Sequence, residues 1–139
     1  VDASTYTVGI TADGNGDITL NVSSGMAQDM VGNDNSAAAP QVAVYDIVAP
    51  VVTIMNADTV NAANAASYSV DGSCDTGDGD VTVTIAGATP ETQDASCTAG
   101  SWIAVFNVAA IADGSNALSI AASQTDAASN TGSAGPVQV

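Results

Sequence analysis

The sequence predicts an all-β fold in which short strands alternate with turns. Val, Thr and Ile recur in short alternating runs, and clusters of Gly, Asn, Asp and Ser separate these runs. No stretch carries the sustained 3.6-residue period of an amphipathic helix. The apolar residues, 46% of the chain, are largely Ala and Val, so we expect a thin core of small side chains between the strands.

The C-terminal part of the chain contains enough strands for a complete sandwich. Strands are predicted near residues 51–55, 67–73, 80–86, 91–97, 102–108, 116–122 and 135–139. Val81, Val83 and Ile85 share one face of their strand, as a half-buried strand requires. Residues 102–108 are apolar on both faces, which predicts a central strand or one covered by a neighbour. Seven short strands in about 90 residues are typical of an immunoglobulin-like β-sandwich, which we expect over residues 50–139.

Residues 1–49 are predicted to form a three-stranded half domain that repeats the last three strands of the complete one. Its strands are expected near 5–12, 17–24 and 40–46. The repeat consists of two matched loops at an offset of 97 residues, each preceded by a matched apolar pair: Asp29-Met-Val-Gly-Asn33 with Asp126-Ala-Ala-Ser-Asn130, and Leu20-Asn-Val22 with Leu118-Ser-Ile120. Internal repetition at about one domain length indicates a tandem array, so residues 1–49 are predicted to be a partial immunoglobulin-like unit.

The half domain needs a partner, because three strands bury little apolar area and leave open sheet edges. Three arrangements would complete it. The chain is an excerpt of a longer protein whose preceding residues supply the missing strands, or a neighbouring subunit supplies them and so builds a filament by strand addition. In the third arrangement the strands pack onto their own C-terminal domain as an enlarged sandwich.

The charge composition excludes several classes of function. The chain has no Lys, Arg or His and fifteen Asp or Glu, which gives a net charge of −15. Nucleic-acid binding is excluded because it depends on Lys and Arg that displace counterions from phosphate. Membrane insertion is not expected, because no apolar run reaches the 18 or so residues of a spanning helix. An enzyme is not expected either, since the commonest general base and the Schiff-base amine are both missing.

The two cysteines are predicted to form a disulfide. Cys74 and Cys97 lie near the ends of two predicted strands, and an even pair in such an acidic chain indicates an oxidising compartment. Closing a loop of this length stabilises a protein by roughly 3 kcal/mol in the chain-entropy model. Two unrelated buried thiols are the alternative. The disulfide and the anionic surface together predict an extracellular or cell-surface location.

Calcium is the cofactor that the residues suit, because it takes hard oxygen ligands from carboxylates, amides and carbonyls. One candidate site is the loop Asp75-Thr-Gly-Asp78-Gly-Asp80, which gathers three carboxylates beside Cys74. Its spacing lacks the bidentate Glu of an EF-hand. A solvated hairpin turn is the alternative for this loop, because Asp and Gly are ordinary turn formers.

A second candidate calcium site lies at the junction of the two parts. Asp46 would meet Asp113 or Asp71 there and tie adjacent domains together. As the alternative, Asp46 caps the turn before Pro50.

Three further positions have a structural interpretation. The Asp29/Asn33 and Asp126/Asn130 loops are predicted to be structural turns held by Asx bonds to backbone amides. Trp102 suggests a sugar-stacking platform, but its position at the start of an apolar strand favours the core.

The chain resembles the bacterial immunoglobulin-like domains that are repeated in large extracellular adhesins and biofilm surface proteins. The resemblance rests on the junction Asp46-Ile-Val-Ala-Pro50-Val-Val-Thr-Ile54, on Gly100-Ser-Trp102 and on the two Asp-x-x-Gly/Ser-Asn loops. It covers essentially the whole chain, as a half copy followed by a full copy. Ser129 replaces the Gly that is usual in the loop. The resemblance implies an extracellular stalk or adhesive module, often made rigid by calcium at its junctions.

These observations favour a non-enzymatic extracellular structural protein. We expect a subunit or segment of a filament or adhesin stalk, with a homo-polymer or tandem copies as its partners and strand complementation as one route of assembly. The alternative is a calcium- or carbohydrate-binding module of a larger cell-surface adhesin. A glycoside hydrolase with paired carboxylates is a third class, which the scarcity of aromatic residues disfavours.

Overall fold

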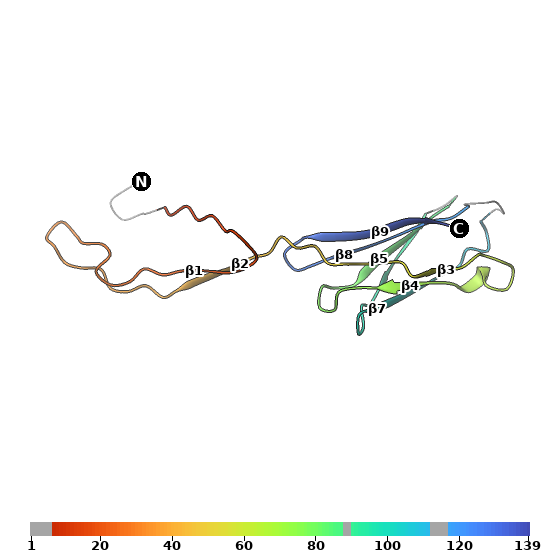
Figure 1. The fold of residues 1–139 in the computed structure, drawn as a ribbon, viewed down its shortest axis with the longest axis horizontal. Coiled ribbons are helices and arrows are strands. Elements are labelled where there is room, and N and C mark those ends of the chain that lie inside the picture. The colour runs from red at the N-terminus through yellow and green to blue at the C-terminus, as the bar shows by residue number, and fades with distance from the viewer. Residues whose placement is uncertain (1–6, 88–89, 112–116) are drawn as a thin grey trace. The chain divides into compact units, whose positions relative to one another are not determined.

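The computed structural model describes residues 7–87, 90–111 and 117–139. The chain divides into two compact units, Val1–Ile47 and Val48–Val139. This boundary lies two residues before the one expected from the sequence. Figure 1 shows strands of both units and a short 3₁₀ turn, Ala65–Ser67. The prediction of an all-β fold is confirmed.

The C-terminal unit is a sandwich of two antiparallel sheets. Its strands are β3 (Asn56–Ala57), β4 (Tyr68–Ser73), β5 (Val81–Ala86), β6 (Glu91–Ala95), β7 (Ser101–Phe106), β8 (Ser119–Thr125) and β9 (Thr131–Gln138). One sheet has the order β3-β4-β7 and the other has the order β6-β5-β8-β9. The chain therefore crosses between the sheets after β4, after β6 and after β7. Two antiparallel sheets joined by such crossings form the immunoglobulin-like sandwich that the sequence predicts.

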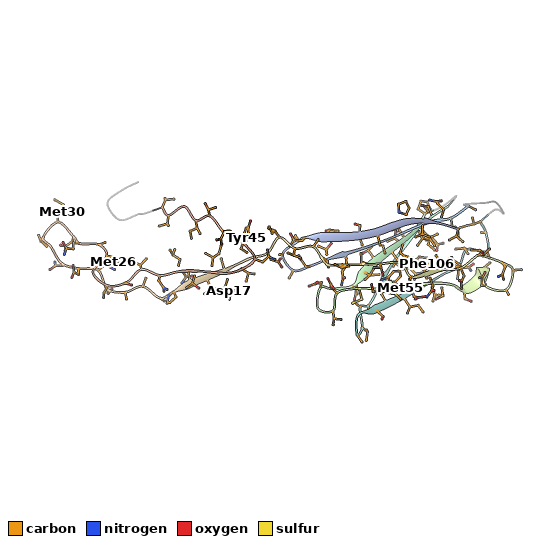
Figure 2. All side chains as sticks on the ribbon, viewed as in Figure 1. Asp17, Met26, Met30, Tyr45, Met55 and Phe106 are labelled. Carbon is orange, nitrogen blue, oxygen red and sulfur yellow. A yellow bond between two sulfur atoms is a disulfide. The ribbon has the colours of Figure 1, made fainter. Side chains whose placement is uncertain are left out.

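The core lies between the inner faces of these sheets. Alternate residues of β4, β5, β7 and β8 are buried, as the two-residue period of a strand requires. The large buried side chains include those of Trp102, Tyr68, Phe106, Ile85 and Ile120, and small Val and Ala side chains fill the space around them. Phe106 is labelled in Figure 2. Full burial of one Val, Ile or Phe side chain stabilises the folded state by about 1.5–3 kcal/mol. This layer therefore supplies most of the stability of the C-terminal unit.

Strand β7 lies at the end of its sheet, and the prediction of a central or covered strand over residues 102–108 is wrong for the described residues. Trp102, Ala104 and Phe106 face the core and are buried. Ile103 and Val105 face outwards and are 62% and 48% exposed. The outer face of β7 is therefore apolar although it is exposed.

Residues 50–55, called the leading segment below, run beside β4 without forming a regular strand, although a strand was predicted at 51–55. The amide of Thr53 donates to the carbonyl of Ser73 over 3.0 Å, and the amide of Met55 donates to the carbonyl of Asp71 over 2.9 Å. The carbonyl of Pro50 instead lies against Gly132 of β9, in the other sheet. Because the segment passes from one sheet to the other, a continuous ladder begins only at β3.

Trp102 fastens the leading segment to β4. Its indole Nε1 donates to the carbonyl of Thr53 over 3.1 Å and to the carbonyl of Ser73 over 3.0 Å. The hydroxyl oxygens of Thr53 and Ser73 lie 2.7 Å apart. Gly72 permits this approach, because a Cβ at that position would collide with the carbonyl of Thr53 and the ring of Trp102. The core interpretation of Trp102 is therefore correct.

The N-terminal unit is one long hairpin. Strands β1 (Gly16–Leu20) and β2 (Gln41–Tyr45) pair antiparallel, from Gly16 opposite Tyr45 to Leu20 opposite Gln41. Beyond them the amide of Ala38 donates to the carbonyl of Val22 over 2.9 Å, and an isolated bridge joins Gln28 and Asp34. The two arms therefore stay paired as far as the loop that begins at Asp29.

The described part of this hairpin sheet has two strands, not the three that were predicted. Residues 7–12 form no strand, and residues 5 and 6 of the predicted strand at 5–12 lie outside the described residues. At the offset of 97 residues, residues 7–9 correspond to the last three residues of β7, which pairs with β4 in the C-terminal unit. Residues 1–49 contain no counterpart of β4. A strand without a ladder partner does not form, and this explains the difference.

Replacing Gly72 with Ala tests the attachment of the leading segment. The new Cβ forces the carbonyl of Thr53 and the ring of Trp102 apart, so we expect Gly72→Ala to lower the free energy of unfolding by about 1–3 kcal/mol. Urea denaturation followed by the fluorescence of Trp102 measures this loss. Gly14→Ala is the matched control, because no atom lies within 4 Å of its added Cβ. Equal stability of the two variants would contradict the close approach.

Candidate functional site

The distinctive surface of this molecule is the uncovered apolar surface of the N-terminal hairpin. None of the described residues from 7 to 47 is buried. The large apolar side chains exposed there are those of Val8, Ile10, Leu20, Val22, Met26, Met30, Val31, Val42, Val44 and Ile47. Figure 2 labels Met26 and Met30 near the turn of the hairpin. These side chains lie on both faces of the hairpin, because Val42 pairs with Thr19 whereas Leu20 pairs with Gln41. So many exposed large apolar side chains mark an interaction site.

The same apolar pair lies in two different environments within this chain. Leu118 and Ile120 are 2% and 0% exposed, because the opposite sheet of the sandwich covers them. Their counterparts Leu20 and Val22 are 38% and 43% exposed. The two pairs precede matched loops, so the difference arises from the missing second sheet and not from the local sequence.

The two matched loops have the same hydrogen bonds. In the first loop the amide and the side-chain Nδ2 of Asn33 donate to the two carboxylate oxygens of Asp29, over 2.9 and 2.8 Å. In the second loop the same two groups of Asn130 donate to the carboxylate of Asp126, both over 2.8 Å. The amide of each Asp returns a 3.0 Å bond to the carbonyl of its Asn. The loops therefore act as structural turns and use their carboxylates internally.

These bonds stabilise the charged form of both carboxylates. The backbone amide of Asn33 is the largest cause that lowers the pKa of Asp29 below its ordinary value of 3.8. For Asp126 the largest cause is the side-chain amide of Asn130, and its pKa is lowered as well. Donors that bond a carboxylate favour its ionised form.

The loops differ at the position before the Asn. Gly32 has a φ of 89° in the first loop, and Ser129 has a φ of 72° in the second. The loop thus requires a left-handed backbone, which Gly adopts without strain and Ser does not. The departure of Ser129 from the usual Gly therefore introduces local strain.

The proposed calcium loop is held by hydrogen bonds to protein groups. The carboxylate of Asp75 accepts the amide of Val51 over 2.7 Å, which ties the loop to the leading segment. Gln124 is buried and bonds the loop from the other side, accepting from the amide of Asp75 over 3.0 Å and donating to the carbonyls of Asp75 and Gly79 over 2.8 and 3.0 Å. In the described residues no group of three acidic or Cys side chains is arranged to hold a metal ion. Calcium binding at Asp75, Asp78 and Asp80 stays a prediction.

Gln124 is the residue that sequence reasoning missed. It occupies an inward position of β8, at which an apolar side chain is expected, and it satisfies three backbone groups of the loop. A polar residue at an inward position of an otherwise apolar strand was the available signal. Leaving such buried groups without partners costs about 1–3 kcal/mol each, so Gln124 organises this end of the sandwich.

The acidic residues of the proposed junction site have partners within their own units. The carboxylate of Asp46 accepts from the side-chain amide of Asn15 over 2.8 Å, and that of Asp71 accepts from Asn56 over 2.9 Å. Asp113, the third residue of this candidate, lies outside the described residues. The junctional calcium site also stays a prediction.

The disulfide joins the two sheets at one end of the sandwich. Cys74 follows β4 and Cys97 follows β6, and their Cα atoms lie 6.0 Å apart. The amide of Cys74 donates to the carbonyl of Gly100 over 3.1 Å, which fixes the turn that leads into β7. The disulfide therefore lies at the same end of the sandwich as the leading segment, the calcium candidate loop and Trp102.

The described residues offer little for sugar binding. A cavity of about 300 Å³ lies at the other end of the sandwich and is lined mainly by small aliphatic side chains, among them Val60, Val108, Ile111 and Leu118. No aromatic side chain lines it, and the indole of Trp102 is buried with its N–H already bonded. Neither feature provides the aromatic platform that the carbohydrate alternative needs.

Comparison with protein-family models, with curated proteins and with solved structures finds no match to this chain. Nothing helical in residues 7–87, 90–111 and 117–139 has the length and hydropathy that a bilayer crossing needs. The interpretation of the site therefore rests on its own geometry.

Replacing Ser129 with Gly should stabilise the C-terminal unit by about 0.5–1 kcal/mol, because Gly adopts the left-handed backbone of this loop without strain. Thermal unfolding of the two chains measures the change. Ala128→Gly is the control, and we expect it to lower stability, because Ala128 has no left-handed backbone and Gly makes the unfolded chain more flexible. A loss of stability in Ser129→Gly would show that the loop is not strained.

Stability should fall in acid as Asp126 and Asp29 are protonated. The pKa of each carboxyl group is lower in the folded state than its ordinary value of 3.8. Its contribution to the free energy of unfolding is therefore present above pH 3.8 and is lost as the pH falls through the pKa of the folded state. Chemical denaturation between pH 7 and pH 2 measures this dependence. In Asp126→Asn the decline below pH 4 should be shallower than in the parent chain. An unchanged decline would show that the loop does not contribute.

Proposed function

We propose that this chain is a non-enzymatic extracellular structural protein, a segment of a stalk or filament built from immunoglobulin-like sandwiches. The observation that supports this proposal is the uncovered hairpin, which repeats the β8–β9 hairpin of the complete sandwich with its apolar pair exposed. A surface of this kind needs a second sheet of the same type. In an array of complete repeats, each repeat contains the sheet that covers its own hairpin.

The complete sandwich indicates which strands the hairpin lacks. Strand β8 pairs with β9 on one side and with β5 on the other, so the corresponding arm of the hairpin lacks a counterpart of β5. Residues 7–9, which correspond to the end of β7, lack a counterpart of β4. Both missing strands belong to the front half of a repeat. Preceding residues of a longer chain or a neighbouring subunit would provide this front half.

The charge of the chain suits such an assembly. Copies that each carry a net charge of −15 and no cation cannot join through complementary side-chain charges. They join through backbone ladders and small apolar side chains, while salt screens their repulsion. The Cys74–Cys97 disulfide supports a location outside the cell, where such bonds persist.

Restoring the missing strands tests this proposal. Placing residues 50–97 in front of Val1 adds one front half at the repeat offset. We expect the hairpin then to fold as a second sandwich, because Leu20 and Val22 become buried. Amide exchange at β1 and β2 should slow at least tenfold, and a second cooperative unfolding transition should appear.

A matched control distinguishes completion of the N-terminal hairpin from the effect of a longer chain alone. In the control the added copies of Val81, Val83 and Ile85 are replaced by Ser, so the added segment cannot form an apolar core with the hairpin. We expect fast exchange at β1 and β2 in this control. Equally fast exchange with the unaltered addition would contradict the proposal. Electron microscopy of the parent chain then distinguishes the source of the strands, because filaments indicate a neighbouring subunit and single particles indicate preceding residues.

A further inference from the structure

The free edge of β7 is the second unusual surface of this protein. In the described residues β7 pairs only with β4, so its other edge presents unpaired backbone groups. A short bridge between Thr98 and Ser101 occupies the first residue of this edge, which leaves Trp102–Phe106 open. Open edges of this kind are templates for pairing with another strand.

The other edge strands of the sandwich carry features that discourage pairing. Strand β6 has Glu91 and Asp94, β9 contains Pro136 and faces a register shift in β8, and β3 is only two residues long. Strand β7 has the sequence SWIAVF, which contains no charge, Gly or Pro. It also has the exposed Ile103 and Val105 on its outer face. Natural proteins usually protect edges, so the bare edge of β7 indicates a docking surface.

We propose that this edge binds the same edge of a second copy of the chain, with the two β7 strands antiparallel and centred on Ala104. This arrangement places Ile103 of each copy opposite Val105 of the other, so two exposed apolar pairs become cross-strand neighbours. Trp102, Ala104 and Phe106 keep their places in their own cores. The contact is the same on both copies, as a two-fold interface requires.

The absence of charge along this edge permits a second copy as the partner. An identical chain brings no cation, so a contact between copies forms only where neither side presents carboxylates. The nearest carboxylate in the sheet is that of Asp71, which lies opposite Ile103 on β4 and is bonded by Asn56. In the joined sheet the two Asp71 side chains lie three strand spacings apart and two residues apart along the strands, a separation of about 16 Å. This separation exceeds the Debye length of about 8 Å at 0.15 M salt but not the 30 Å at 0.01 M.

The inference does not depend on how the N-terminal hairpin is completed. Completion of the hairpin involves β4- and β5-like strands from a front half of the repeat, whereas the β7 contact joins two finished sandwiches side by side. Stalks joined in this way would associate laterally in saline surroundings and separate at low salt.

Site-specific cross-linking tests the register. Chains with Ile103→Cys are mixed with chains with Val105→Cys under mild oxidation at 0.5 M NaCl. We expect the mixed disulfide between the two variants to form at least tenfold faster than the Ile103→Cys self-link, because opposite positions have Cβ atoms about 5 Å apart. Equal rates for the mixed and the self-linked product would overturn the proposed register.

Sedimentation tests the association itself. The parent chain should form dimers at 0.5 M NaCl and sediment as a monomer at 0.01 M. Ile103→Asp should raise the dissociation constant at least tenfold, whereas Met55→Asp, at an exposed apolar position outside β7, should leave it unchanged. Fluorescence of Trp102 verifies that both variants are folded. Association that persists in Ile103→Asp, or none at any salt concentration, would overturn the proposal. Persistent association would then be assigned to the N-terminal hairpin.

Discussion

The rest of this structure depends on whether a second sheet covers the apolar side chains of a β-hairpin. In the C-terminal unit the sheet β3-β4-β7 covers the β8–β9 hairpin, and the buried layer between them holds the fold together. In the N-terminal unit a matching hairpin keeps its backbone bonds and its loop but has no covering sheet. Local bonds thus define the shape of a hairpin, while burial determines whether it becomes a domain.

One end of the sandwich gathers the groups that hold its irregular parts. Trp102 bonds the leading segment, Gln124 bonds the loop after Cys74, and the disulfide joins that loop to the turn before β7. Each of these groups satisfies or fixes backbone that lies outside the regular ladders. The irregular segments at this end are therefore held by hydrogen bonds and the disulfide.

Features that depend on neighbouring residues were predictable from the sequence, and features that depend on distant pairing were less so. The all-β class, the alternation in β5 and the Asx bonds at Asp126 follow from short patterns. The edge position of β7 and the missing ladder for residues 7–12 depend on which strand lies beside which. Gln124 was missed because its partners, Asp75 and Gly79, lie more than 40 residues away.

The disulfide also sets how far this domain can stretch. Cys74 and Cys97 are 23 positions apart, so β5 and β6 lie inside a closed covalent loop. When the two ends of the chain are pulled, the residues of this loop cannot be drawn out, which shortens the extended length by roughly 70 Å at about 3.4 Å per residue. Oxidation therefore limits the extension of the C-terminal unit when it is unfolded.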